Sequence, residues 1–237
     1  MESSVTEQEA EVVVCTANPK WRNGASLALV IRKSFGYCAD RKGKLWFQDR
    51  LDKYMEENLE PNGKWAVSSA EIISVEEAPK NKIPNCKHVI QVISPNFTGL
   101  PSSANCKKNK WGPQGKKSDD YSEAKKKKMG KELVEAEDLK EKYKELERAY
   151  QNCLAKASSH ASVSIPAISS KMMGCKLDPG FDTALKVIDQ FLKKPPRGNK
   201  LRDIRLCAYG KHATDSSLDE FPAAKRAFAR LCAASED

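Results

Sequence analysis

The sequence lacks the cysteine and histidine spacings that hold structural metal ions. Its eight cysteines are spread over 237 residues without a CxxC pair, whereas a zinc site requires closely spaced cysteine or histidine ligands. Several cysteines lie within apolar runs such as VVVC and IRLCAY, which is typical of reduced core thiols in a cytosolic or nuclear protein. We therefore expect no metal, no disulfide framework and an intracellular location, cytoplasmic or nuclear.

Long hydrophobic runs are absent as well. The longest apolar stretch is only a few residues, and the first residues, MESSVTEQEAE, are acidic and polar. A membrane-spanning helix needs about 20 predominantly apolar residues, and a secretory signal needs a basic start followed by an apolar core. We expect neither a membrane span nor a signal peptide.

Positive charge is abundant but concentrated in one region. The formal net charge is +9, from 41 basic and 32 acidic residues. The stretch Lys107–Lys131 holds ten lysines and three acidic residues, so it accounts for +7 of that charge. A lysine run can bind nucleic acid by neutralising phosphates, although only Trp111 and Tyr121 within it could stack on bases. A solvated surface loop explains the same composition, and the pattern favours it.

Strand-like and helix-like segments alternate along the chain. β-Branched runs predict strands over 10–17, 65–75, 88–94, 162–168 and 203–210. Helical periodicity predicts helices over 24–35, 44–58, 130–157, 182–192 and 221–233. The stretch 96–128 has the composition of a disordered insertion. This order predicts a layered α/β fold with a mostly parallel sheet, as a single domain over 1–237.

One stripe of the helix predicted over 130–157 is apolar. Its members are Leu139, Tyr143, Leu146, Tyr150, Cys153 and Ala157. The stripe is compatible with a dimeric coiled coil, but it spans fewer than four heptads. It therefore favours a helix that packs on the sheet, and we expect the chain to be a monomer.

Two loops follow predicted strands and lead towards helices. They are NPKWRNGAS at 18–26 and SSKMMGCK at 169–176. In layered α/β folds, ligands bind beyond the carboxyl ends of the strands, and the amides at helix N-termini suit phosphate groups. Gly24, Ala25 and Ser26 are small enough to let backbone amides approach an anion. Most such loops are only connections, so this pattern alone does not establish a ligand site.

At these loops the sequence resembles the macro domain family, whose members bind ADP-ribose and related nucleotides. SSVT stands at the family's GDIT motif, VCTAN at VNAAN, NGASL at GGGGV, and Gly36 at the end of the following helix. HVIQVISPNF, SVSIPAISS and IRLCAY match the family's later strands in order. The resemblance covers most of the chain outside the lysine-rich stretch. It implies a three-layer αβα sandwich with a mixed, mostly parallel central sheet.

The resemblance also implies a set of ligand-binding residues. Asn18 would contact the distal ribose, Tyr209 would stack on the adenine, and Val5 would lie near the adenine. The amides along the diphosphate and distal ribose would come from Gly24, Ala25, Ser26 and Leu27. The second phosphate loop would consist of Ser169, Ser170, Lys171, Met172, Met173 and Gly174. The implied partner is ADP-ribose or an ADP-ribosylated protein, and no cofactor is implied.

Several positions depart from the family's motifs. Ser4 replaces the acid that contacts the adenine amino group, and Cys15 replaces the first asparagine of VNAAN. Ala28 stands where hydrolytic members have an aspartate, and alanine can neither act as an acid nor activate water. Asp178 in GCKLD matches the catalytic aspartate of another branch, but Pro95 occupies the approximate place of that branch's lysine.

These departures favour a module that binds ADP-ribose or a related nucleotide with weak or no hydrolysis. Asp178 is the candidate catalytic residue, although a turn residue in LDPG is the simpler explanation. One alternative is an ADP-ribosyl hydrolase or O-acetyl-ADP-ribose deacetylase. The other is a nucleic-acid- or protein-binding domain whose nucleotide pocket has degenerated.

Overall fold

The computed structural model describes residues 4–17, 27–39, 43–58, 65–98, 121–170, 173–208 and 220–234. Its elements follow in the order η1 (Val5–Glu7), β1 (Val12–Ala17), α1 (Leu27–Ser34), α2 (Trp46–Asn58), β2 (Ala70–Ser74), β3 (His88–Ile93), α3 (Tyr121–Ala157), β4 (Ser162–Pro166), α4 (Leu177–Lys193), β5 (Asp203–Cys207) and α5 (Phe221–Ala233). The predicted alternation of strands and helices is confirmed.

The strands form one mixed sheet in the order β2-β3-β1-β4-β5. β1 pairs in parallel with β3 and β4, β4 pairs in parallel with β5, and β2 is antiparallel to β3. β1 lies in the middle, where a parallel strand is covered on both faces. Its run of three valines and a cysteine suits that position, because each of these side chains is fully buried.

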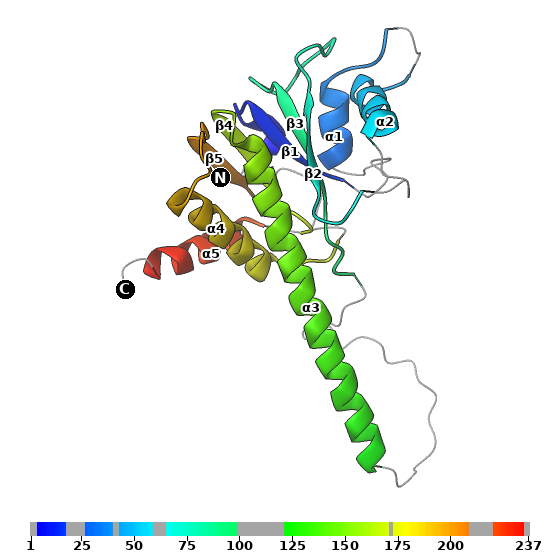
Figure 1. Ribbon diagram of the computed structural model, residues 1–237, viewed down its shortest axis with the longest axis vertical. Coiled ribbons are helices and arrows are strands. Elements are labelled where there is room, and N and C mark those ends of the chain that lie inside the picture. The colour runs from blue at the N-terminus through cyan, green and yellow to red at the C-terminus, as the bar shows by residue number, and fades with distance from the viewer. Residues whose placement is uncertain are drawn as a thin grey trace.

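Helices cover both faces of the sheet (Figure 1). Val13 and Cys15 point to the side of α1 and α2, whereas Val12 and Val14 pack with residues of α3 and α4. This alternation follows from the two-residue period of a strand. α5 packs on α4 through a separate small apolar cluster. The fold is therefore the three-layer αβα sandwich that the resemblance implied.

The long helix α3 begins earlier than its sequence pattern predicts. It starts at Tyr121 rather than near Gly130, so 121–128 is helical and not part of a disordered insertion. Lysine and alanine are good helix formers, which explains the extension. Its 37 residues span about 55 Å, and the first half extends well beyond the sheet (Figure 1). Despite this length, neither α3 nor any other described helix is apolar enough to cross a membrane.

The apolar stripe of α3 packs on the sheet, as its short length favours. Leu146, Tyr150 and Cys153 are buried in one cluster with residues of β1, β3 and β4.

α4 also begins earlier than predicted, at Leu177 instead of near residue 182. Pro179 falls in its first turn, where the missing N–H costs no helical hydrogen bond. β2 is shorter than predicted and begins only at Ala70, after a turn in which Ser68 has a φ of 72°.

An amide group is buried in β3 with poor hydrogen bonding. Gln91 is fully buried, and among the described residues its amide finds only the thiol of the neighbouring Cys15. We expect Gln91→Met to raise the free energy of unfolding by about 1 kcal/mol, because it removes a poorly paired polar group at similar volume. Urea titration measures this, with the exposed Gln190→Met as the control. A loss of stability would show that the amide is well paired.

Candidate ligand-binding site

The carboxyl ends of the parallel strands lie at one edge of the sheet. β1 ends at Ala17, β4 at Pro166 and β5 at Cys207, and β4 lies between the other two. The segments that follow β1, β4 and β5 therefore begin side by side. Seven predicted site residues lie outside the described ranges, namely Asn18, Gly24, Ala25, Ser26, Lys171, Met172 and Tyr209. The structure does place the other seven, which are Val5, Leu27, Ser169, Ser170, Met173, Gly174 and Asp178.

Val5 and Leu27 belong to the apolar cluster on the α1 and α2 face. Val5 is fully buried in this cluster, together with Ala17 and Ala28, and Leu27 packs against it while partly exposed. Ser4 precedes Val5 and forms a capping box with Glu7, whose carboxylate accepts the Ser4 N–H at 3.1 Å. The Ser4 hydroxyl also accepts the Thr6 N–H at 3.3 Å. The structure thus assigns Val5 and Ser4 local packing and capping contacts.

The loop after β4 is tied to the loop after β3. Ser169 has a left-handed φ of 67°, and its hydroxyl donates to the carbonyl of Pro95 at 2.8 Å. The N–H of Phe97 donates to the carbonyl of Met173 at 2.7 Å. Gly174 follows with a φ of 73°. Two contacts from the β3 side therefore hold the described ends of the predicted second phosphate loop, at Ser169 and at Met173.

Tyr150 of α3 forms hydrogen bonds with the backbone at the start of the same loop. Its hydroxyl accepts the N–H of Ile168 at 2.9 Å and lies 3.5 Å from the carbonyl of Pro166. The side chain is fully buried, and this burial raises the pKa of Tyr150. Sequence reasoning assigned Tyr150 only to the apolar stripe. Its hydroxyl could have indicated the hydrogen bond to the loop, because a buried tyrosine hydroxyl needs a polar partner.

Asp178 joins α4 to α5. Its carboxylate accepts two hydrogen bonds from the Arg226 guanidinium, at 2.8 and 2.7 Å, and lies 3.5 Å from Arg230. The hydrogen bonds from Arg226 are the main cause of its lowered pKa. A carboxylate held in this way is a weak base. The catalytic role of Asp178 stays a prediction, and the observed role is a contact between helices.

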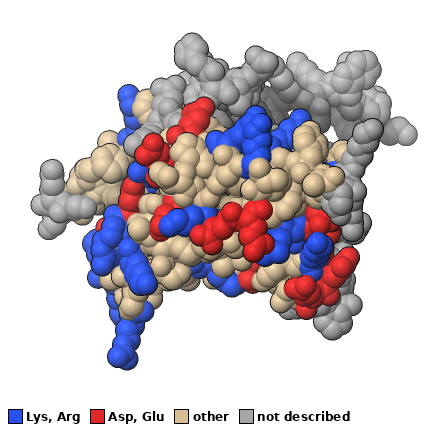
Figure 2. Space-filling model, turned by 90° about the horizontal axis from the view of Figure 1, so that it is seen from above, with Lys and Arg blue, Asp and Glu red and all other residues tan. Residues whose placement is uncertain are grey.

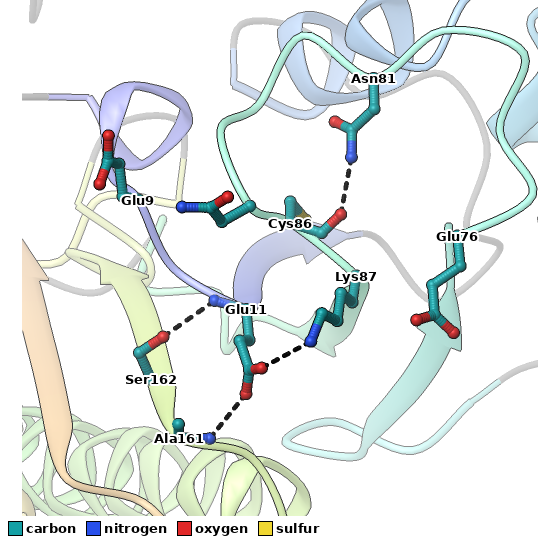
Figure 3. A pocket seen from close by; sticks show the side chains of 9 residues that line it. Glu9, Glu11, Glu76, Asn81, Cys86, Lys87, Ala161 and Ser162 are labelled. Atoms are coloured by element: carbon teal, nitrogen blue, oxygen red, sulfur yellow. Dashed lines mark hydrogen bonds and ion pairs between the residues drawn. The ribbon is translucent and has the colours of Figure 1, made fainter.

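A cleft of about 600 Å³ lies at the opposite edge, near the amino ends of the strands (Figure 3). Glu11 accepts hydrogen bonds from Lys87 Nζ and from the N–H of Ala161, each at 2.8 Å. The N–H of Glu11 also donates to the Ser162 hydroxyl at 2.9 Å. Glu11 thus links the starts of β1, β3 and β4, and its contacts are those of a structural residue.

Two histidines lie side by side near Glu11, and the pKa of one of them is shifted. The rings of His88 and His160 lie 4.4 Å apart, and burial followed by the charge of His88 lowers the pKa of His160. Glu11 opposes this shift, while Lys87 and Lys200 add to it. Because the folded state disfavours the protonated form, the stability it confers is complete above a pH of about 6.5 and is lost as the pH falls below that value.

We expect the free energy of unfolding to decline between pH 7 and pH 5, and His160→Phe to flatten that decline. Denaturant titrations at several pH values measure both. The lowered pKa of Glu11 acts in a lower window, since its contribution is lost only below its usual pKa of about 4.5. An unchanged slope in His160→Phe would assign the decline to other groups.

Comparison with solved structures identifies several of the same architecture. A macrodomain variant from Oceanobacillus iheyensis with ADPR matches with a TM-score of 0.64 at 15% identity, covering 97% of this chain and 90% of that chain. The Trypanosoma brucei macrodomain in complex with ADP-ribose matches with a TM-score of 0.55 at 13% identity, covering 95% and 66%. The macro domain of ganglioside induced differentiation associated protein 2 matches at 0.52 and 15%, covering 87% and 73%. No protein-family model and no curated protein matches the sequence.

Proposed function

Because this chain has the macrodomain fold, we propose that it binds ADP-ribose or ADP-ribosylated proteins at the carboxyl edge of its sheet, with weak or no hydrolysis. The observation that carries the proposal is the set of hydrogen bonds that holds the described ends of the loop after β4. Ser169, Met173 and Ile168 are each held by hydrogen bonds from outside the loop. Residues that are already held before binding lose little conformational entropy when a ligand enters.

The chemistry around this loop suits an anionic ligand. Ser169 and Gly174 both have a left-handed backbone, the conformation that lets neighbouring amides form anion-binding concavities in phosphate loops. α4 starts at Leu177, directly after the loop, so its N-terminal dipole favours negative charge there. ADP-ribose carries a diphosphate, the kind of anion that helix N-termini and loop amides bind.

The candidate catalytic groups support binding over hydrolysis. Ala28 is buried in α1 and carries no titratable group. Asp178 is paired with Arg226, which lowers its pKa and weakens it as a base. General acid–base catalysis contributes about 10²–10⁴-fold to a rate, so its loss leaves a binder with slow turnover.

Calorimetric titration of the full chain with ADP-ribose tests the proposal. We expect saturable binding at submillimolar concentrations, and no heat at millimolar ligand would overturn it. A second assay follows release of ADP-ribose from a modified protein. Rapid release that disappears in Asp178→Ala would support the hydrolase alternative instead.

Nucleic-acid binding through Lys107–Lys131 is the second candidate function. Four of its lysines, Lys125–Lys128, lie in the part of α3 that extends beyond the sheet (Figure 1). The face in Figure 2, by contrast, shows basic and acidic groups interspersed. We expect replacement of these four lysines by glutamine to abolish any salt-dependent RNA binding, measured by fluorescence anisotropy, and to preserve ADP-ribose affinity.

A further inference from the structure

The cleft at the amino edge of the sheet is acidic. Its lining contains Glu9, Glu11 and Glu76 but only one lysine, Lys87, which is already paired with Glu11 at 2.8 Å. Glu9 and Glu76 are exposed and lie on opposite sides of that pair (Figure 3). Within the described ranges, neither of them forms an ion pair. This acidic cleft of about 600 Å³ therefore presents two carboxylates without a cationic partner in the described part of the chain.

A basic loop lies at the same edge, between α4 and β5. Its ten residues, 193–202, hold five basic side chains and no acidic one, namely Lys193, Lys194, Arg197, Lys200 and Arg202. Cations near the C-terminus of a helix interact favourably with its dipole, which accounts for Lys193 and Lys194 at the end of α4. Arg197 and Lys200 lie beyond the helix, are exposed, and form no ion pair among the described residues. The dipole of α4 does not explain these two cations.

Backbone hydrogen bonds hold the basic loop beside the acidic cleft. The N–H of Arg202 donates to the carbonyl of Ala161 at 2.9 Å. Ala161 also lines the cleft and donates its own N–H to Glu11. The N–H of Lys200 donates to the carbonyl of Ser158 at 2.7 Å. The loop is thus fixed before a partner binds, so docking costs it little conformational entropy.

The amino edge therefore carries opposite charges on neighbouring parts of one surface. A two-fold axis through such a surface places the positive part of one copy against the negative part of the other, so the surface is complementary to itself. We propose that the amino edge is an interface between two copies of this chain, in which the basic loop of each copy enters the acidic cleft of the other. The inference goes beyond the proposed function and does not depend on ADP-ribose binding. It does not involve the apolar stripe of α3, which was considered above for a coiled coil.

Sedimentation velocity of the full chain tests the interface. Exposed ion pairs are individually weak and are screened by salt. We expect a reversible dimer at about 200 µM protein in low salt, and its dissociation in about 0.5 M sodium chloride. A parent protein that stays monomeric under both conditions overturns the inference. A monomer that binds an oligolysine peptide or a short DNA duplex overturns it as well, because the cleft or the loop would then serve another partner.

Reversal of the charges on the two surfaces tests their pairing. The variant Arg197→Glu/Lys200→Glu makes the loop acidic, and Glu9→Lys/Glu76→Lys makes the cleft basic. We expect each variant alone to dimerise about tenfold more weakly than the parent, because like charges then face each other across the interface. An equimolar mixture of the two should recover the dimer to within about threefold of the parent, because both contacts of the mixed dimer again join opposite charges.

The variant Lys140→Glu/Lys225→Glu is the matched control. Both lysines are exposed, on α3 and α5, and each replacement lowers the net charge by two, from +9 to +5 in all, as in the loop variant. We expect this control to dimerise like the parent. Weakening equal to that of the loop variant would assign the effect to net charge and overturn the inference.

Two further outcomes would also overturn it. Undiminished dimerisation in both reversal variants would place the interface on another surface. Losses that the mixture does not restore would show that the loop and the cleft do not meet each other. Urea titration verifies that each variant is folded. If the double variant of the cleft does not fold, Glu76→Lys and Arg197→Glu repeat the mixing experiment with one charge from each surface.

Discussion

Phe47→Ala lowers the free energy of unfolding by about 3–5 kcal/mol, the loss expected for a large buried ring. Phe47 is fully buried in α2, and its ring centroid lies 5.2 Å from that of Phe35. Both belong to the cluster that joins α1 and α2 to one face of the sheet. Truncation removes the contact with Phe35 and leaves a cavity that the surrounding side chains fill only in part.

Urea denaturation and thermal unfolding measure this loss. For a chain of this size, we expect the melting temperature to fall by about 10 °C. Phe228→Ala is the control, because Phe228 lies on α5 with 58% of its surface exposed. It should change stability by less than about 0.5 kcal/mol. Equal effects of the two substitutions would contradict the assignment of Phe47 to the core.

Gly174→Val should impair both stability and binding. Gly174 has a φ of 73°, and a Cβ there would lie 3.3 Å from Thr98 Cγ2 and 3.5 Å from the Thr98 N–H nitrogen. A β-branched residue with positive φ costs on the order of 1–3 kcal/mol, and the contact with Thr98 adds to that. Displacement of Gly174 would distort the proposed phosphate loop, so we expect ADP-ribose affinity to fall by about tenfold or more.

Gly198→Val separates backbone strain from the close contact. Gly198 has a similar φ of 79°, but a Cβ there would meet no atom within 4 Å. We expect it to carry the backbone penalty alone and to leave ADP-ribose affinity unchanged. Calorimetry of both variants, with urea titration in parallel, measures the two effects. Equal losses of affinity would show that the loop after β4 does not contact the ligand.

Cys15 and Ala28, two positions that depart from the family's motifs, are buried in the core. Cys15, at the position of the first asparagine in VNAAN, is fully buried beside Val13, and burial raises the pKa of its thiol to about 11. Ala28 is buried in the same cluster. Small apolar groups at these positions pack without needing hydrogen-bond partners. The fold can therefore be retained while polar chemistry beside the proposed site is lost.

The sequence by itself determined the order of strands and helices, the buried central strand and the sheet-packing stripe of α3. These features depend on local periodicity and composition, which neighbouring residues express without reference to distant parts of the chain. The same local patterns predicted the two loops, 18–26 and 169–176, that follow strands. The predicted start of α3 was wrong, because the composition of 121–128 suits both a solvated loop and a helix.

Only the tertiary structure decided the strand order and the contacts that shape the candidate site. Ser170 and Glu220 are 50 residues apart, and Asp178 and Arg226 are 48 apart. Such pairs meet because α4 and α5 pack together beside the sheet, and no periodic pattern encodes which polar side chains then face each other. The sequence could name Ser170 and Asp178 as candidates, but their partners followed only from how the helices cross.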